Sequence, residues 1–360
     1  MHVRPQLREL EHAFHPELAV IGVHSPKFTN EKPTESLQQA VLRLGVEHPV
    51  VSDPDLRVWS EYAVDAWPTV MVVDPAGKVV GKQVGEFRSS ELQPLIADML
   101  AEFAAKGMLD GTPLDLKAEA PPNTPLLFPG KLLTDASSGR LFVSDSGHHR
   151  IVVATLDGKV QQTVGSRKGF RDGGFAEAAF DTPQAVALDG ELLYVADTGN
   201  HAVRRIDLAS GVVGTVAGTG ELARRVKEGP ASTTPLRSPW GLAVHRGILY
   251  IAMAGSHQIW ALDPTTGELL RYAGSGREAL VDGPLARATF AQPSGLASDG
   301  ERLYVADSES SALRAVDLPG AGDRVQTLVG QGLFDFGDVD GSGARVRLQH
   351  DLDAAVEPPA

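Results

Sequence analysis

A nine-residue phrase returns four times in the last two thirds of the chain, and this repetition limits the possible folds more than any other feature. The phrase opens with Leu, an aromatic residue and Val or Ile, and in three copies it carries Asp at its fifth position. The copies start 52, 56 and 54 residues apart. A period of this size predicts an array of similar structural units. The copies are Leu141–His149, Leu193–His201, Leu249–His257 and Leu303–Ser311.

Each unit contains four predicted strands. A proline-centred segment comes first, the repeated phrase second, a β-branched segment third and a short strand last, and such residues suit a pleated surface. Tight turns such as Asp157-Gly158 supply the positive φ that a hairpin needs. Four strands in about 50 residues are typical of a β-propeller blade. In the second unit these strands are expected at 182–188, 193–197, 203–207 and 214–220.

The segment between units also repeats. Asp172–Phe180 and Asp282–Phe290 share the pattern Asp-Gly-x-x-Ala-x-x-x-Phe, and each stands at the same distance before a proline. A third copy, Asp340–Leu348, predicts a fifth blade with its proline at 351, but position 351 is Asp. We therefore expect four blades plus a stub over residues 125–360. Two interpretations stay open: a C-terminus that is truncated or frame-shifted, and a small propeller closed by the N-terminal region.

The second unit resembles the NHL repeat. Its motif is Asp197–His201, and a Pro-x-Gly-Leu-Ala strand precedes the corresponding phrase in two of the units. The resemblance covers the four units and implies a propeller that binds a protein partner through one face. NHL-like propellers commonly close with six blades, so four blades plus a stub would leave open strand edges, which favour association.

The repeated Asp and His residues are the obvious candidates for a site. A metal site would need them to converge on one ion, whereas the repeat places one set in each blade. We therefore predict structural roles, with each Asp accepting backbone N–H groups in a turn and each His joining neighbouring strands. Met253 at one of the Asp positions agrees with this interpretation. The residues concerned are Asp145, Asp197, Asp307, His149, His201 and His257.

Residues 1–107 follow a different pattern. The apolar run Leu18–Val23 predicts a buried parallel strand, and Thr34–Leu44 has helical spacing with Gly45 as its stop. The order of strands and helices indicates an α/β sandwich. Further strands are expected at 49–52, 67–74 and 79–84, further helices at 1–10, 55–62 and 89–107, and a Pro-rich linker at 108–124.

Trp67-Pro68-Thr69, followed by an apolar strand, an Asp-Pro-x-Gly turn and another strand, resembles a thioredoxin-like domain. The resemblance implies a cis peptide bond at Pro68; a trans proline opening an edge strand is the alternative. With the repeats and the segment Ile21–Phe28, it extends to a family of bacterial proteins related to NHL repeat-containing protein two, in which a thioredoxin-like domain precedes an NHL propeller.

The chain has no cysteine. The resemblance implies a first core strand followed by a Cys-x-x-Cys pair, and this chain has neither. We therefore predict an incomplete domain without redox activity. We also predict that the missing strand leaves an apolar sheet edge exposed at Val20–Val23. This domain should be the weaker of the two. We also expect the natural gene to extend before Met1. The alternative function is therefore a fragment of a thiol–disulfide oxidoreductase whose Cys-x-x-Cys lies upstream.

The remaining sequence excludes several functions. A formal net charge of −13 disfavours nucleic acid and anionic membranes as partners, which leaves RNA binding as a minor alternative. No phosphate-binding loop, nucleophile elbow or His-Glu-x-x-His occurs, and a lactonase-like hydrolase would need acids that converge on a metal. We predict a cytoplasmic protein-interaction module with no catalytic residue, cofactor or metal. The partner's identity and the oligomeric state are not predicted.

Overall fold

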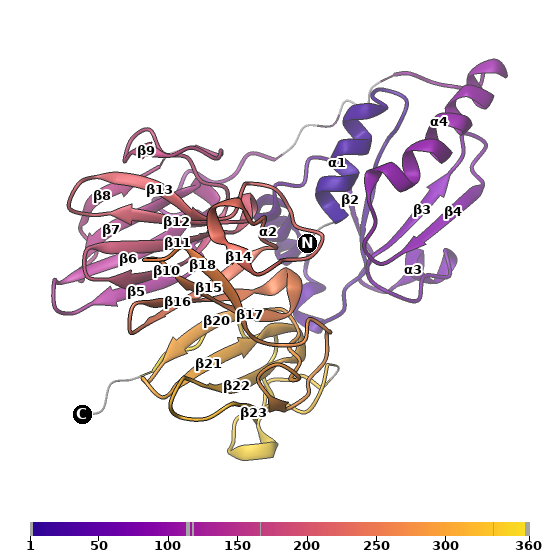
Figure 1. The fold of residues 1–360 in the computed structure, drawn as a ribbon. Coiled ribbons are helices and arrows are strands. Elements are labelled where there is room, and N and C mark those ends of the chain that lie inside the picture. Colours follow the sequence, from indigo (N-terminus) through magenta and orange to yellow (C-terminus); the bar gives the residue numbers. More distant parts are fainter. Residues whose placement is uncertain (1–2, 113–115, 117–118, 166, 334, 357–360) are drawn as a thin grey trace. The chain divides into compact units, whose positions relative to one another are not determined.

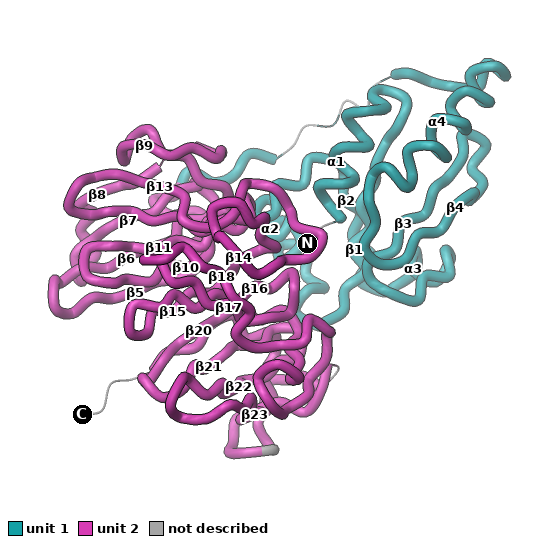
Figure 2. Tube along the Cα trace, viewed as in Figure 1, with its two compact units in different colours: residues 1–123 teal, residues 124–360 magenta. Residues whose placement is uncertain are grey.

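The computed structural model describes residues 3–112, 116, 119–165, 167–333 and 335–356. The chain divides into two compact units, unit 1 with residues 1–123 and unit 2 with residues 124–360 (Figure 2). Part of the predicted linker 108–124 lies outside the described residues. Each unit is described by itself below.

The described residues of unit 2 form four antiparallel sheets, one for each repeat, and this confirms the four predicted blades (Figure 1). The first strands of successive blades, β5, β10, β15 and β20, contact one another in chain order. Blade 1 has β5 Leu132–Asp135, β6 Arg140–Asp145, β7 Arg150–Thr155 and β8 Val160–Val164; blade 2 has β10 Pro183–Asp189, β11 Leu192–Asp197, β12 Ala202–Asp207 and β13 Val212–Ala217. Blade 3 has β15 Pro239–His245, β16 Ile248–Met253, β17 Gln258–Asp263 and β18 Glu268–Ala273; blade 4 has β20 Pro293–Ser298, β21 Arg302–Asp307, β22 Ala312–Asp317 and β23 Arg324–Val329.

Three blades gain a two-residue fifth strand that the sequence analysis did not predict. Each comes from the blade linker, the segment between the last strand of one blade and the first strand of the next, and pairs with the last strand of the blade that follows. Two residues carry too little periodicity to be recognised in a sequence. Each linker therefore pairs with the outer edge of the blade that follows it in the chain. These strands are β9 Gly173–Gly174, β14 Gly229–Pro230 and β19 Gly283–Pro284.

The core of unit 2 lies between adjacent blades. Leu193, Val195 and Ile206 of blade 2 are fully buried and belong to one cluster with Phe142 and Ile151 of blade 1. Similar clusters join blade 2 to blade 3 and blade 3 to blade 4. Since each blade buries its apolar side chains against a neighbour, the repeats stabilise one another.

The segment after blade 4 begins like the start of another blade. His350 has a φ of 47°, as Thr182, with 51°, has before blade 2. Ser308 Oγ donates a hydrogen bond to Asp351 O at 2.7 Å, and Thr198 Oγ1 donates to Pro239 O at 2.6 Å in the corresponding place. The stub therefore lies against blade 4 in the register in which blade 3 lies against blade 2, although residues 346–356 form no strand.

Unit 1 has helices and strands in the predicted order, and two of them, α2 and β4, have the predicted bounds. Gly45, with a φ of 56°, ends α2 in the left-handed conformation that glycine adopts without strain. A core cluster including Leu10, Leu92 and Ile96 brings together α1 and α4. The elements are α1 Val3–Ala13, β1 Gly22–His24, α2 Thr34–Leu44, β2 Val50–Ser52, α3 Arg57–Glu61, β3 Thr69–Val73, β4 Val79–Val84 and α4 Ser89–Ala105.

The prediction of a buried strand over Leu18–Val23 was wrong in extent and in burial. Only Gly22–His24 forms a strand, and the side chains of Ile21 and Val23 are 57% and 44% exposed. Among the residues of unit 1 that the structure describes, β1 pairs in parallel with β2 alone and β3 pairs only with β4, which gives two separate two-stranded sheets. An apolar run is buried only where other elements cover it, and β1 has a partner strand at one edge only.

Asp53 organises the segment that precedes β3. Its buried carboxylate accepts hydrogen bonds from the backbone N–H groups of Arg57, Val58 and Trp59 at 2.7, 3.1 and 3.0 Å. Burial acts to raise the pKa of Asp53, but these bonds and one from Ser25 outweigh it and lower the pKa below its ordinary value. The carboxylate thus caps the first turn of α3.

Candidate functional site

The repeated Asp and His residues flank a short turn that follows the second strand of every blade. A single 3-10 turn comes directly after the position that Asp holds, and it ends at a residue with positive φ. The turns are Ser146–His148, Thr198–Asn200, Ala254–Ser256 and Ser308–Ser310, and the residues that end them are His149, His201, His257 and Ser311, with φ of 54°, 48°, 55° and 48°.

The three repeated carboxylates are fully buried at the start of these turns. Each accepts a hydrogen bond from a backbone N–H group of the segment leading into its own blade, at 2.7 Å in every case. This bond holds the incoming chain against the turn. The pairs are Asp145 with Leu127, Asp197 with Asp181, and Asp307 with Ala291.

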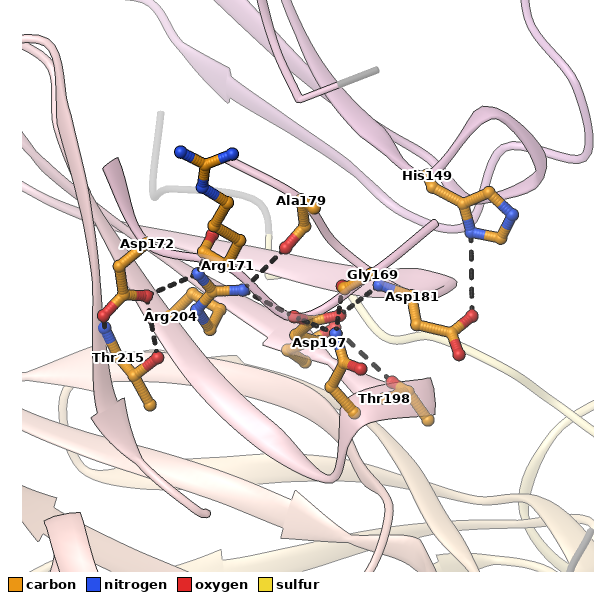
Figure 3. Close-up of polar contacts among 12 residues, drawn as sticks. His149, Gly169, Arg171, Asp172, Ala179, Asp181, Asp197, Thr198, Arg204 and Thr215 are labelled. Carbon is orange, nitrogen blue, oxygen red and sulfur yellow. Dashed lines mark hydrogen bonds and ion pairs between the residues drawn. The ribbon is translucent and has the colours of Figure 1, made fainter. Parts of the chain in front are cut away.

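The repeated histidines join one blade to the next. In each, Nδ1 accepts a hydrogen bond from a backbone N–H group at the entry to the following blade: from Thr182 to His149 at 3.1 Å, from Ser238 to His201 at 3.3 Å, and from Gln292 to His257 at 3.2 Å. Burial lowers the pKa of His149, which favours the neutral ring that can accept such a bond. In Figure 3 the same ring also faces Asp181, with His149 Nδ1 lying 3.7 Å from Asp181 Oδ1.

Arg204 was not predicted as a site residue; it lies fully buried on β12, the middle strand of the blade 2 sheet (Figure 3). Its guanidinium donates to Asp197 Oδ2 at 2.9 Å and to Asp172 Oδ1 at 2.6 Å. It also donates to the carbonyl oxygens of Ala179 and Arg171 at 2.9 and 2.7 Å. One cation thus joins the repeated Asp to the Asp-Gly motif of the blade linker, and four acceptors offset the cost of burying its charge.

Blade 4 repeats this arrangement. Arg314, also fully buried, donates to Asp307 at 3.2 Å and to Asp282 at 2.9 Å. In both blades the outer carboxylate holds the last strand too: Asp172 accepts from Thr215 N at 3.1 Å, and Asp282 accepts from Thr327 N at 3.0 Å. A signal for this was present in the sequence, since an Arg stands seven residues after the repeated Asp in both units.

The two kinds of carboxylate have opposite pKa shifts. Burial raises the pKa of Asp197 and of Asp307 to about 6, in spite of the hydrogen bonds that favour their charged forms. At the outer carboxylates burial acts in the same direction, but bonds from threonine and arginine outweigh it and lower the pKa of Asp172 and of Asp282. Each buried arginine therefore bonds to an inner carboxylate with a raised pKa and to an outer carboxylate with a lowered pKa.

Blade 3 replaces the whole pair with apolar residues. Met253 holds the place of Asp197, and Trp260 pairs with Ile251 as Arg204 pairs with Val195. Both side chains are buried. A catalytic or metal-binding role would require the charges, whereas a buried ion pair and an apolar pair of similar volume are interchangeable in a structural role.

The candidate residues of unit 1 lie before β3. The Trp67–Pro68 peptide bond is cis, so the trans alternative is not adopted. Trp67 Nε1 donates to Ser25 O at 2.9 Å, and the Trp67 ring lies against that of Trp59, with centroids 4.2 Å apart. Thr69 Oγ1 donates to Ala66 O at 2.7 Å. These contacts fix the loop between α3 and β3.

Within residues 3–112, 116, 119–165, 167–333 and 335–356, no group of three or more His, Asp or Glu side chains is placed to hold a metal ion. Over the same part of the chain, no helix has both the length and the apolar composition needed to cross a bilayer.

No protein-family model matches the chain. NHL repeat-containing protein 2 of Gallus gallus and that of Homo sapiens are each 41% identical to it over 98% of this chain and 53% of theirs. Protein SUPPRESSOR OF QUENCHING 1, chloroplastic, of Arabidopsis thaliana is 42% identical over 98% of this chain and 35% of its own. A solved protein of unknown function from Bacteroides thetaiotaomicron shares the fold, with a TM-score of 0.50 and 22% identity over 64% of this chain and 54% of that one.

The chain spans about half the length of the NHL repeat-containing protein 2 relatives that it matches. The identity to them extends over nearly all of this chain, including both units. The chain is therefore similar to NHL repeat-containing protein 2, and its second unit is an NHL-type β-propeller of four blades.

Proposed function

We propose that this protein is a protein-interaction module, in which the propeller carries the binding face and unit 1 is a thioredoxin-like domain without redox activity. The observation that carries the proposal is the different placement of polar and apolar side chains in unit 2. The repeated polar side chains are engaged inside the blades, whereas each of four successive linker segments exposes one large apolar side chain. Loops on a rigid scaffold are the usual place for binding.

The proposed binding surface, called here the linker face, consists of four apolar side chains on four successive linker segments. Val281 and Val339 each directly precede an Asp-Gly pair of the repeated linker motif. Exposed apolar side chains on successive linkers favour a partner that contacts several blades together. The four are Phe170, Leu222, Val281 and Val339, which are 42%, 37%, 50% and 49% exposed.

A protein partner fits the charge of the chain better than a nucleic acid does. The formal net charge is −13, and a protein that binds phosphates gains most of its affinity from Lys and Arg. Apolar side chains on the linker face would instead be covered by apolar groups of another protein. We also propose the cytoplasm as the location.

The proposal for unit 1 rests on two features. The Trp67-Pro68-Thr69 loop opens β3 within the predicted order of elements, and the chain has no cysteine to form a thiolate. The alternative, part of a thiol–disulfide oxidoreductase, is favoured by one observation: the relatives are about twice as long as this chain. The intact mass of the protein from its source cells, compared with 38.1 kDa, separates the two. A heavier species with Cys-x-x-Cys peptides would favour the oxidoreductase.

The binding face is tested with a double substitution, Leu222→Ser with Val281→Ser. The matched control, Val160→Ser with Val212→Ser, alters two side chains at the start of β8 and β13 that are at least as exposed as the two test residues. Wild type and both variants are used to capture proteins from the source cells, and the captured proteins are quantified by mass spectrometry. We expect the linker-face variant to lose specific partners that the control retains. Equal capture by both variants would overturn the linker face as the binding surface.

A further inference from the structure

The linker face is divided by charge. The segments that hold Phe170 and Leu222, residues 167–172 and 222–227, contain six Lys or Arg and one Asp together. The segments that hold Val281 and Val339, residues 277–282 and 335–340, contain one Arg and five Asp or Glu together. Within a chain that is acidic as a whole, one half of the linker face is therefore basic and the other half acidic.

The basic side chains of the first half are all exposed. Among the residues that the structure describes, one of the six forms an ion pair, Lys168 with Asp181 at 3.4 Å, and the Lys168 side chain stays 57% exposed. Most of these charges are therefore not used to hold the blades and are available to a ligand. The six are Arg167, Lys168, Arg171, Arg224, Arg225 and Lys227.

Phe170 is held in place among these charges. The Cζ atom of the buried Arg204 lies 5.1 Å from the centroid of the Phe170 ring, a distance typical of a cation–π contact. Gly220 of the next linker lies against the edge of the ring, because a Cβ atom at Gly220 would come within 2.9 Å of Phe170 Cδ1. The ring is nevertheless 42% exposed. A partner that covers it would lose little affinity to the ordering of this side chain.

The contact between Phe170 and Gly220 also brings two linkers together. Leu222 follows Gly220 by two residues, and two residues of chain span at most about 7 Å. Two exposed apolar side chains from different linkers therefore lie near each other within the basic half. In the next blade the equivalent glycine, Gly276, lies against Gln258 instead of an aromatic ring. The combination of aromatic ring, apolar neighbour and basic surroundings thus belongs to this pair of linkers.

We propose that the basic half of the linker face binds an acidic protein segment that carries large apolar side chains. Carboxylates of the segment would pair with the exposed Arg and Lys side chains, and its apolar side chains would cover Phe170 and Leu222. A nucleic acid fits less well, because a polyanion that extends along the linker face would meet the acidic half. This inference rests on the proposed function and adds the chemistry of the partner.

The test uses the full chain and a phage-displayed library of random peptides, selected at physiological salt. We expect the enriched peptides to be acidic and to contain aromatic or large aliphatic residues. Fluorescence anisotropy of an enriched peptide should show saturable binding that weakens as the salt concentration rises. Enrichment of neutral or basic peptides, or no enrichment, would overturn the proposal. Tighter binding of an oligouridylate than of the enriched peptides would overturn it as well.

Two charge-reversal variants locate the binding. Arg224→Glu with Arg225→Glu changes the basic half, and the matched control, Arg277→Glu with Arg287→Glu, reverses two exposed charges on the following linker. We expect binding of the enriched peptide to weaken at least about tenfold in the first variant and less than about twofold in the control. Equal weakening in the two variants would overturn the proposal.

A failure of this inference is distinguishable from a failure of the linker face itself. The capture experiment with Leu222→Ser and Val281→Ser decides the linker face without reference to charge. If that variant loses its partners while the two charge-reversal variants bind the peptide equally, the linker face is the binding surface and the acidic partner is wrong.

Discussion

The two units of this protein bury their sheets to very different degrees. In unit 2 the middle strands of the blades are covered on both faces, and Leu193, Val195 and Ile206 have no exposed surface. In unit 1, Val23 on β1 and Val84 on β4 are 44% and 45% exposed. Both units are rich in β-branched residues, so composition does not explain the difference. In unit 2 every described blade has a neighbouring blade, whereas in the described part of unit 1 β1 and β3 each have one strand partner.

The units also differ in how they hold polar groups. Unit 2 places buried ion pairs at the same position of two blades and substitutes an apolar pair in a third. In unit 1 the comparable buried carboxylate, Asp53, bonds only to backbone N–H groups and to Ser25. In the repeated fold of unit 2, the same ion-pair arrangement therefore holds buried carboxylates in two blades. In unit 1 the buried carboxylate is held by contacts within its own segment and by Ser25.

The largest expected difference is in resistance to proteolysis. Regions with few buried apolar contacts open locally at low free energy, and protease cleavage follows that opening. We expect trypsin to digest residues 3–112 at least about ten times faster than residues 124–356. Mass spectrometry of timed digests measures the survival of each fragment. Equal resistance of the two units would contradict the comparison.

Next in size is the loss of a buried arginine. Arg204→Met leaves the buried carboxylate of Asp197 without its cation, and breaking such a pair costs about 3–5 kcal/mol. Urea unfolding followed by circular dichroism measures the change in the free energy of unfolding of unit 2. Arg205→Met is the matched control, because Arg205 is exposed on the same strand, and its expected effect is about 0.5 kcal/mol or less. Similar effects of the two substitutions would show that the buried network is not stabilising.

The third prediction concerns pH. The folded-state pKa of Asp197 and Asp307 is about 6, above the ordinary value for Asp. At a pH between the ordinary pKa and the folded-state pKa, the folded protein therefore binds more protons than the unfolded chain. The free energy of unfolding of unit 2 should therefore fall as pH rises from about 4 to about 6, by about 2–3 kcal/mol per carboxylate.

Asp53 provides the opposite case in unit 1. Its pKa is lowered in the folded state, so its contribution is present above its ordinary pKa and is lost as pH falls below about 3.9. Urea unfolding across this pH range separates the two behaviours. Asp197→Asn should flatten the slope of unit 2 between pH 4 and 6; an unchanged slope would assign it to other groups.

The fourth prediction concerns replacing the buried ion pair of blade 2 with the apolar pair found in blade 3. Asp197→Met with Arg204→Trp places the buried apolar pair of Met253 and Trp260 at the position of the ion pair. Because neither charge remains buried alone, we expect the double variant to lie within about 2 kcal/mol of the wild type in urea unfolding. If the double variant loses as much free energy of unfolding as the two single variants together, the apolar pair is stabilising only in the surroundings that blade 3 provides.

The smallest expected effect is at the histidines that join the blades. His201→Ala removes the acceptor for Ser238 N, and loss of one such hydrogen bond costs about 1 kcal/mol. His201→Asn keeps a side-chain acceptor and a residue that tolerates the φ of 48°, so its loss should be smaller. Thermal unfolding measures both variants. If they are equally destabilised, the hydrogen bond does not contribute.

Much of the fold was predictable because its strands and helices follow from short patterns in the sequence. The strands of the blades follow from β-branched segments between turns, and α2 at Thr34–Leu44 and β4 at Val79–Val84 have the predicted bounds. The repeat also predicted that each Asp accepts backbone N–H groups at a turn and that each His joins neighbouring strands. The buried role of Arg204 was not predicted, because a single arginine in a strand looks like an exposed charge until its surroundings are known.

The amino-acid sequence by itself determined the number of blades, the position of their strands and the absence of thiol chemistry in this chain, since periodicity and composition are local properties. Only the tertiary structure decided which charges are paired and which apolar strands are covered. Arg204 reaches Asp172 from 32 residues away, and Val23 stays exposed although its run is apolar. Both outcomes depend on which segments fold against one another, and that is a property of the assembled chain.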